Sequence, residues 1–299
     1  MKKHLFFIIY GSILLISTVL SVLGTFIIPN DLSDSNIIGG GEEPTFEAPT
    51  SSIILTENSY KDENIEITIT QVREYETEIY VADIKLANNK LMQTAFAEDR
   101  FGQNVKEHTS KIAKRNNAIL AINGDYYGFR LKGYVIRNGV LYGEDREYRN
   151  KTSDILIVHD DGSFEVMKEY LTTPKELYDL DAWQVFCFGP GLISNSEIIV
   201  DSKSEVGGHK ESNPRTAIAI IEPGHYLMVV SDGRTEESAG LSLLQMAEFL
   251  KKYKVTDAYN LDGGGSSTMV FNGKVVNKPT TNGVNIRERG ISDIVYIGY

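Results

Sequence analysis

The chain has 299 residues, with 30 Lys and Arg against 41 Asp and Glu, and a formal net charge of −11. This balance excludes nucleic acid as a partner, because phosphate backbones are bound by basic surfaces and no basic block is present. With 41% hydrophobic residues, the chain can bury a substantial core, which excludes a wholly disordered or collagen-like protein.

The first predicted element is a membrane helix. Residues 5–28 form an uncharged stretch of 24 residues, and about 20 apolar residues suffice to cross a bilayer. Lys2 and Lys3 precede the stretch and acidic residues follow it, so the positive-inside rule predicts a cytoplasmic end at residues 1–4. A cleaved signal peptide is the alternative, but its apolar core usually runs about 7–15 residues, which favours an uncleaved anchor. We therefore expect a single-pass protein of the cell membrane with its remaining residues outside.

A flexible acidic linker is predicted next, over residues 29–55. It contains Gly39, Gly40 and Gly41 followed by Glu42 and Glu43, and it has no apolar period. Residues 56–299 are predicted to form one domain.

That domain is predicted to be α+β, sheet-rich and mainly antiparallel, with a few helices. Short apolar runs and alternations predict the strands, and turn sequences such as Asn138-Gly139 separate many of them. The strand candidates are 65–69, 79–86, 118–122, 133–137, 155–159, 216–221, 226–231, 268–271 and 293–297. Helices are predicted at 104–115, at 241–253 with Ser242 as N-cap, and from Pro174 with Thr173 as N-cap.

The most distinctive motif is an aspartate followed by three glycines and three hydroxyl residues, Asp262 to Thr268. Consecutive glycines permit positive φ and expose backbone N–H groups, so such a loop can wrap an anion. The hydroxyl groups of Ser266, Ser267 and Thr268 would add donors. No lysine follows the glycines, so the motif is not a P-loop. A flexible Gly-Ser turn is the alternative, but the aspartate and the flanking strand-like residues favour a functional loop.

A second polar segment follows the apolar run 118–122 and contains Asn123, Asp125, Tyr126 and Tyr127. A strand that ends in these residues can present polar groups and an aromatic surface to a sugar ring. The alternative is a hairpin loop whose tyrosines pack back onto the sheet.

Charged residues flank further strand candidates. Arg215 precedes one strand, and Asp232 and Arg234 follow the next. Each arginine could clamp a phosphate through two N–H bonds, and Asp232 could orient an arginine or transfer a proton. His209 lies in a glycine-rich loop that could border the same site, and Glu288 and Arg289 offer another charge pair. Taken singly, each of these charged residues could also be a solvated surface residue or part of a turn.

In this order the motifs resemble the phosphodiester glycosidase family over about residues 60–299. The matching segments are NGDYY (123–127), GYVIRNG (133–139), GPGLI (189–193), NPRTAIA (213–219), SDGR (231–234), DAYNLDGGGSSTMV (257–270) and RERG (287–290). The segment around Asp262 is the most specific of them. Family members usually carry Gly-Glu-Arg-Pro near the end, whereas this chain has Arg287-Glu288-Arg289-Gly290 without the proline.

The resemblance implies hydrolysis of a sugar-1-phosphodiester at the anomeric carbon, with N-acetylglucosamine as the sugar, in cell-envelope or exopolysaccharide glycan. Free sugar and a phosphomonoester would be released by the extracellular domain. Because phosphate leaves readily as an anion, the site needs anion stabilisation and a carboxylate more than a strong general acid. The candidate carboxylates are Asp262, Asp125 and Asp232. Asp262 is foremost, with its role open between nucleophile, base and orienting group.

The sequence predicts neither a cofactor nor a metal. The remaining candidates are predicted substrate-binding residues: Asn123, Tyr126, Tyr127, His209, Arg215, Arg234, Gly263, Gly264, Gly265, Ser266, Ser267, Thr268, Glu288 and Arg289. One alternative function is a metal-dependent phosphodiesterase with Asp125, His209, Asp232 and Asp262 as ligands, although His pairs and close ligand spacing are lacking. The other is a non-catalytic envelope-glycan binder, which has no need of three carboxylates beside an anionic ligand. The sequence leaves the oligomeric state open.

Overall fold

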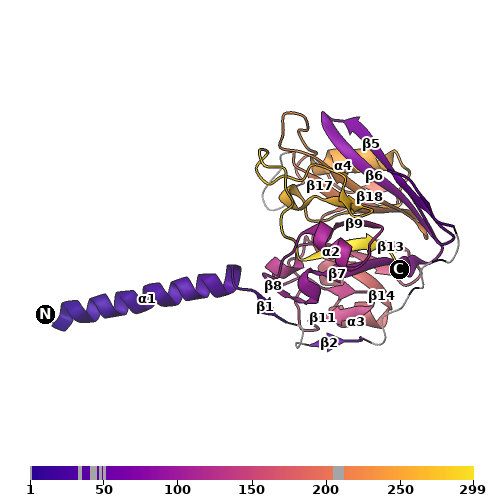
Figure 1. The fold of residues 1–299 in the computed structure, drawn as a ribbon. Helices are drawn as coiled ribbons and strands as arrows, with labels where there is room; N and C mark the ends of the chain where they lie inside the picture. The colour runs from indigo at the N-terminus through magenta and orange to yellow at the C-terminus, as the bar shows by residue number, and fades with distance from the viewer. Residues whose placement is uncertain (1, 33–35, 41–45, 47–48, 50–51, 205–211) are drawn as a thin grey trace.

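The computed structural model describes residues 2–32, 36–40, 46, 49, 52–204 and 212–299, and it contains a long N-terminal helix and a sheet-rich domain (Figure 1). Every strand pair named among these residues is antiparallel. The predicted α+β class is therefore confirmed.

The strands form four sheets. The nine-stranded sheet has the order β16-β15-β19-β17-β18-β6-β5-β4-β3, and a five-stranded sheet has the order β21-β20-β9-β22-β7. The bounds of the first are β16 Glu197–Ile198, β15 Gly191–Ser194, β19 Asp257–Asn260, β17 Arg215–Glu222, β18 His225–Ser231, β6 Thr77–Leu86, β5 Ile65–Glu74, β4 Ser59–Lys61 and β3 Ile54–Leu55. Those of the second are β21 Lys274–Val275, β20 Met269–Phe271, β9 Leu120–Asn123, β22 Asp293–Ile297 and β7 Met92–Phe96.

The other two sheets contain the short N-terminal strands. A six-stranded sheet has the order β13-β12-β14-β10-β11-β2, with bounds β13 Phe164–Lys168, β12 Asp154–His159, β14 Ala182–Phe186, β10 Ile136–Arg137, β11 Val140–Tyr142 and β2 Ile37–Ile38. The two-stranded sheet pairs β1 (Asn30–Asp31) with β8 (Gly102–Gln103). The predicted strand 133–137 is thus reduced to its last two residues, because Gly133 has a φ of +97° and its N–H bonds to Glu147 instead.

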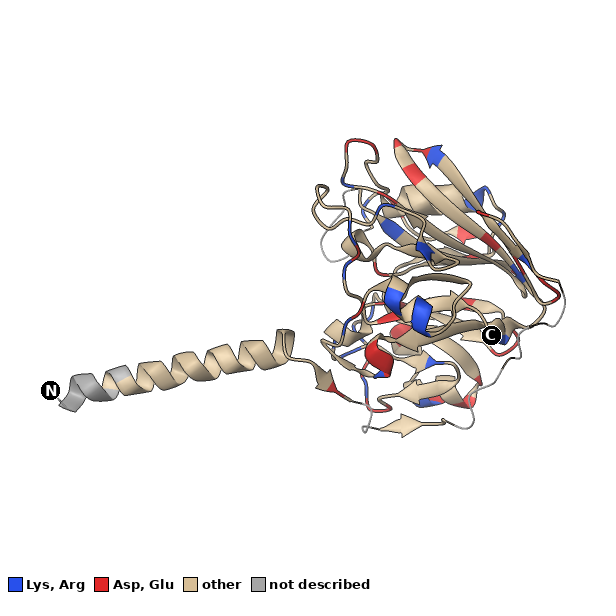
Figure 2. Cartoon of the chain, in the orientation of Figure 1, with Lys and Arg blue, Asp and Glu red and all other residues tan. Residues whose placement is uncertain are grey.

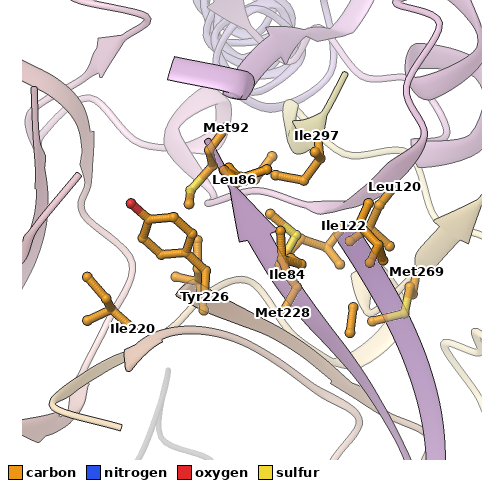
Figure 3. Close-up of a cluster of buried hydrophobic side chains, with 14 of the residues drawn as sticks. Ile84, Leu86, Met92, Leu120, Ile122, Ile220, Tyr226, Met228, Met269 and Ile297 are labelled. Carbon is orange, nitrogen blue, oxygen red and sulfur yellow. The ribbon is translucent and has the colours of Figure 1, made fainter. Parts of the chain in front are cut away.

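The largest core cluster joins the nine-stranded and five-stranded sheets and also includes side chains of the six-stranded sheet, such as Leu156 and Phe186. Figure 3 shows Ile84, Tyr226 and Met228 of the first sheet near Leu120 and Ile122 of the second. These side chains are buried because the two sheets turn their apolar faces toward each other. The sheets are thereby fixed in position, and so are the loops at the ends of β9 and β19.

Three short helices cover the outer faces of the sheets: α2 (Thr109–Arg115), α3 (Pro174–Asp179) and α4 (Leu243–Lys251). Helix α4 packs on the nine-stranded sheet, α2 on the five-stranded sheet and α3 on the six-stranded sheet. Thr173 and Ser242 form capping boxes, as the sequence predicts for these N-caps. The remaining helical segments are 3-10 turns at Asn89–Leu91, Ala97–Asp99, Tyr127–Phe129, Glu169–Leu171 and Gly264–Ser266.

Helix α1 (Lys2–Phe26) is long and apolar enough to cross a membrane, and it is the one such helix among the described residues. Its described residues are exposed along nearly the whole helix, and Figure 2 draws this part in tan, without Lys, Arg, Asp or Glu, whereas charged residues are spread over the domain. This agrees with an apolar N-terminal segment, although the helix begins three residues before the predicted span.

The segment after α1 differs from the predicted linker. Asn30 and Asp31 pair with Gln103 and Gly102, and Ile37 and Ile38 pair with Tyr142 and Leu141. The predicted flexible linker over 29–55 therefore contains strands that pair within the domain: β1 forms the two-stranded sheet with β8, β2 lies at the edge of the six-stranded sheet, and β3 lies at the edge of the nine-stranded sheet. The acidic residues Glu42 and Glu43 lie outside the described residues.

The predicted helix 104–115 begins only at Thr109. Asn104 has a φ of +56°, and its side-chain amide donates to the backbone carbonyls of Thr25 (3.0 Å) and Ile28 (3.2 Å). The residue thus holds the end of α1 against the domain. A left-handed residue engaged in this way cannot begin a helix.

Candidate active site

Two neighbouring loops form the centre of the site, and Asn123 joins them. Its side-chain amide donates to the Asp262 carbonyl at 2.6 Å, and its oxygen accepts from Thr216 Oγ1 (2.8 Å) and the Thr268 N–H (3.2 Å). Asn123 is fully buried. The prediction that it binds the sugar is therefore corrected: it fixes the loop that carries Asp262.

The Asp262 carboxylate is held by two side chains through one oxygen. Oδ2 accepts from Ser266 Oγ at 2.5 Å and lies 3.2 Å from Nη2 of Arg289. Arg289 also donates to Ser266 Oγ from Nε and Nη2, at 3.0 and 2.6 Å. Burial raises the pKa of Asp262 above its ordinary value of 3.8, although Arg289 and Ser266 oppose the rise. The geometry therefore gives one oriented carboxylate that accepts a proton more readily than a typical aspartate.

Two pockets meet at Asp262 and Arg289, which line both. The larger has a volume of about 530 Å³ and is lined by aromatic residues Tyr126 and Phe129, among others. The smaller, of about 220 Å³, includes Arg215, Arg234 and Gly264 in its lining. The larger volume falls within the ~300–1,000 Å³ usual for ligand pockets. We call them the aromatic pocket and the arginine pocket.

The arginine pocket concentrates positive charge. Arg215 is buried, and this burial, with a smaller effect of Arg234, lowers the pKa of Arg215 to about 10, so it remains a cation at neutral pH. Burial and then Arg289 lower the pKa of Arg234. Arg234 donates to the neutral oxygens of Asn213 (Oδ1, 2.9 Å from Nη2) and Thr281 (backbone, 2.7 Å). An anion bound here would relieve the repulsion among these cations.

Part of the glycine loop is occupied by hydrogen bonds within the protein. The N–H of Gly264 bonds to the Pro214 carbonyl at 2.8 Å, and the N–H groups of Ser266 and Ser267 bond back to Gly263 and Gly264. These three donors are used within the protein. Gly264 has a φ of +59°, and a Cβ there would lie 2.9 Å from Nη2 of Arg234. Glycine is therefore needed for the close approach of Arg234.

The hydroxyl residues of the loop separate into one at the site and two in the core. Ser266 Oγ binds Asp262 and also lines the aromatic pocket. Ser267 and Thr268 are fully buried, and neither hydroxyl has a hydrogen-bond partner among the described residues. The prediction that these two hydroxyls bind substrate is therefore corrected. Gly265 is also buried, against Thr281.

Asp125 belongs to a charge cluster inside the core. Its oxygens accept from the N–H groups of Tyr127 (2.8 Å) and Cys187 (3.0 Å), and Oδ1 lies 3.2 Å from Nη2 of Arg137. The same guanidinium binds Asp293 at 2.8 Å. Burial disfavours the charge of Asp125, but Arg137 and Arg130 hold its pKa below the ordinary value. Asp125 lines neither pocket, and the contacts of its carboxylate are structural.

Asp232 is also turned away from both pockets. Its Oδ1 accepts from the Lys278 N–H at 2.8 Å and from Asn277 Nδ2 at 3.2 Å, and Tyr80 Oη reaches Oδ2 at 3.4 Å. Burial raises the pKa of Asp232. These contacts hold the 277–278 segment, and Asp232 is absent from the lining of both pockets. The aspartates of the metal alternative thus lie in three separate environments, and no group that could hold a metal ion occurs among the described residues.

Of the remaining candidates, one lines a pocket and two make structural contacts near it. Tyr126 lines the aromatic pocket and stacks on Phe129, with ring centroids 4.6 Å apart. Tyr127 is buried and stacks on Phe101 at 5.3 Å, so its predicted sugar contact is corrected. Glu288 accepts from the N–H of Ser110 at 2.9 Å and therefore fastens the start of α2. His209 lies outside the described residues.

Sequence reasoning missed Arg137, Asp293 and several residues of the aromatic pocket. Arg137 was visible as a charge in the motif GYVIRNG, and Asp293 as an acid at the start of an apolar strand. Phe129, Lys106 and Lys111 line the aromatic pocket, but no local sequence feature sets them apart.

Comparison with known proteins gives consistent results. The family model described as phosphodiester glycosidase matches residues 116–298. The SPbeta prophage-derived uncharacterized protein YomE of Bacillus subtilis (strain 168) is 27% identical over 249 residues, which cover 79% of this chain and 36% of that protein. The mouse N-acetylglucosamine-1-phosphodiester alpha-N-acetylglucosaminidase is 39% identical over 101 residues, covering 30% of this chain and 19% of that enzyme.

A solved structure shares the fold. The catalytic domain of the zebrafish N-acetylglucosamine-1-phosphodiester alpha-N-acetylglucosaminidase, auto-inhibited by its pro-peptide, has a TM-score of 0.62 at 20% identity, covering 79% of this chain and 83% of that one. The chain spans about a third of the Bacillus relative and about a fifth of the mouse enzyme. The family model covers more than half of the chain and includes Asp262, Arg215, Arg234 and Arg289. The chain therefore belongs to the phosphodiester glycosidase family.

Proposed function

We propose that the protein hydrolyses a sugar-1-phosphodiester by breaking the bond between the anomeric carbon and the phosphate oxygen. The oxygen of water joins the anomeric carbon, the bonding electrons leave with the phosphate, and the products are a free sugar and a phosphomonoester. The observation that carries the proposal is the position of Asp262, a carboxylate that lines both the aromatic pocket and the arginine pocket.

The two pockets suit the two halves of such a substrate. The phosphate would lie among Arg215, Arg234 and Arg289. Each guanidinium can form two N–H bonds to an anion, and the attraction between opposite charges is stronger where water is excluded. The sugar would lie in the aromatic pocket against Tyr126, whose ring offers an apolar surface to the carbon–hydrogen face of a pyranose. The scissile bond would then lie beside Asp262.

Asp262 would supply the carboxylate that this reaction needs. Ionised, it can stabilise the positive charge that develops at the anomeric carbon, or remove a proton from the attacking water. Ser266 and Arg289 hold its Oδ2 and so fix its direction. The phosphate leaves as an anion held by the arginines, and this reduces the need for a second acidic group. The chemistry therefore rests on one carboxylate and a cationic leaving-group site.

The sugar and the location are further parts of the proposal. N-acetylglucosamine is supported by the activity for which the mouse relative is named, and a cell-envelope or exopolysaccharide substrate by the apolar helix α1. With α1 as a signal anchor and residues 56–299 as the catalytic domain, Lys2 and Lys3 would place that domain outside the cell.

The full-length chain in neutral detergent tests this function. It is incubated with the methyl phosphodiester of N-acetylglucosamine 1-phosphate, and reducing sugar and methyl phosphate are measured together. Wild type should release both in equal amounts, and Asp262→Asn should lower kcat by about 10²–10⁴ with an unchanged circular dichroism spectrum. Binding of the diester without turnover would instead support the glycan-binder alternative. Equal turnover by the two proteins would contradict the role of Asp262.

A further inference from the structure

The aromatic pocket contains positive charge that the proposed reaction does not use. Lys106, from the segment before α2, and Lys111, within α2, line this pocket together with Asp262 and Ser266. Both lysines are exposed. Among the described residues, no ion pair within 4 Å is recorded for either of them, whereas ion pairs are formed by most lysines elsewhere in the domain.

The acidic residues of the same pocket have other cationic partners. Asp262 pairs with Arg289 at 3.2 Å, Glu107 with Arg115 at 2.7 Å, and Glu98 with Arg100. Glu107 is near enough for Lys111 to contribute to its lowered pKa, but Oε2 of Glu107 already accepts from Arg115 and from the Glu98 N–H. Arg100 and Arg115 are not among the pocket residues. The lining therefore balances three acids against three cations, and Lys106 and Lys111 are the two of these cations that form no ion pair within 4 Å among the described residues.

The position of Lys106 is set by its packing. A Cβ placed on Gly290 would lie 3.3 Å from both Cβ and Cγ of Lys106, so the lysine stem passes close to the backbone beside Arg289. The glycine leaves room for that stem. Lys106 is thereby held next to the residue that joins the two pockets, and its flexible end can reach a group on a bound sugar.

We infer that the sugar cleaved by this protein carries a second anionic group, phosphate or carboxylate, that Lys106 and Lys111 bind. The inference rests on the proposed function, because it places the scissile phosphate in the arginine pocket and the sugar in the aromatic pocket. A phosphate on both sides of the sugar is the chemistry of a polymer with sugar 1-phosphate repeats, and a carboxylate is that of a uronic acid. Because the whole chain has a net charge of −11, such a substrate needs local cations at each of its charges.

Binding of uncleavable ligands tests the inference separately from turnover. The probes are methyl esters of C-glycosyl phosphonates of N-acetylglucosamine, either neutral on the sugar or carrying a phosphate at C3, C4 or C6, with a C6 carboxylate as a further probe. Calorimetry on the full-length chain in neutral detergent gives each Kd. At least one anionic ligand should bind roughly fivefold more tightly per lysine engaged than the neutral ligand. Tighter binding of a phosphate probe would indicate a polymer with sugar 1-phosphate repeats, and tighter binding of the carboxylate probe would indicate a uronic acid.

The variants decide which residues cause the preference. Lys106→Ala together with Lys111→Ala should abolish the preference, which is measured as the ratio of the neutral to the anionic Kd in each protein. Lys114→Ala is the matched control, because Lys114 lies on α2 without lining the pocket, and it should keep the preference. The inference is overturned if the neutral ligand binds wild type as tightly as all the anionic ones, or if the double variant retains the preference. Failure of the proposed function would appear separately, as absent turnover of the cleavable diester.

Discussion

Nη2 of Arg289 lies 3.2 Å from Oδ2 of Asp262, although 27 residues separate them in the chain. The contact is partly buried, and Ser266 bridges it by bonding to both side chains. It places a cation of the arginine pocket against the proposed catalytic carboxylate. In the proposed reaction, Arg289 would therefore act on Asp262 and on the phosphate of the substrate at once.

The contact between Asp262 and Arg289 predicts how activity depends on pH. Burial raises the pKa of Asp262 above 3.8, and Arg289 lowers it part of the way back. If the ionised carboxylate is the active form, kcat/KM should fall on the acid side with an apparent pKa above 3.8, and Arg289→Ala should move that limb to higher pH. Rates across pH at constant ionic strength measure the shift. Arg287→Ala is the control, and a limb that stays in place or moves to lower pH would contradict the coupling.

Asp262 should also reduce stability at neutral pH. A carboxyl group whose pKa is raised by folding favours the folded state when protonated, and that contribution is lost as pH rises through the folded pKa. Asp262→Asn should therefore melt at a higher Tm than wild type at pH 7, and the difference should shrink toward pH 4. Thermal melts at both pH values test this. Asp201→Asn is the comparison, because the pKa of this exposed aspartate is lowered, and it should show no such gain.

The position of Asp125 in the core predicts that its substitution lowers the stability of the protein and leaves turnover unchanged. Breaking a buried ion pair typically costs about 3–5 kcal/mol, and Asp125 shares Arg137 with Asp293 inside the core. Because Asp293 still pairs with Arg137 in the variant, Asp125→Asn should lower the free energy of unfolding by less than that range. Its turnover per folded molecule should stay close to that of wild type. A normal denaturation midpoint together with lost turnover would restore Asp125 as a catalytic candidate.

The adjacent tyrosines should behave in opposite ways. Tyr126 lines the aromatic pocket, so Tyr126→Ala should raise KM with a small change in Tm. Tyr127 Oη is buried without a hydrogen-bond partner among the described residues, so Tyr127→Phe should leave KM unchanged and stability equal or higher. Tyr127→Ala should cost about 3–5 kcal/mol through the cavity it leaves. A larger KM effect in Tyr127→Phe than in Tyr126→Ala would refute this assignment.

Much of the fold was predictable because its signals are local. Alternating apolar residues predicted long strands such as β5 and β6, and capping sequences predicted the starts of α3 and α4. The failures involve partners that are distant in sequence. Nothing near Asn30 or Ile37 indicates pairing with Gln103 or Tyr142, and the contacts of Asn104 with the end of α1 are equally remote.

In the candidate site, too, local sequence signals were readable and contacts between residues distant in sequence were not. The glycine motif located Asp262, and isolated charges between strands located Arg215, Arg234 and Arg289. Their common pocket depends on how the sheets pack. Sequence alone cannot separate Tyr126 from Tyr127 or Asp262 from Asp125, because each pair has the same chemistry and differs only in burial and in distant neighbours such as Phe101 and Arg137.

The position of an oxygen label tests the central claim most directly. The full-length protein cleaves the methyl phosphodiester of N-acetylglucosamine 1-phosphate in water enriched in oxygen-18, and mass spectrometry locates the label in freshly formed products. Attack at the anomeric carbon beside Asp262 predicts the label in the sugar hydroxyl at C1, none in methyl phosphate, and no labelled product from Asp262→Asn in the same time. Label in the phosphate group would show attack at phosphorus and contradict the account.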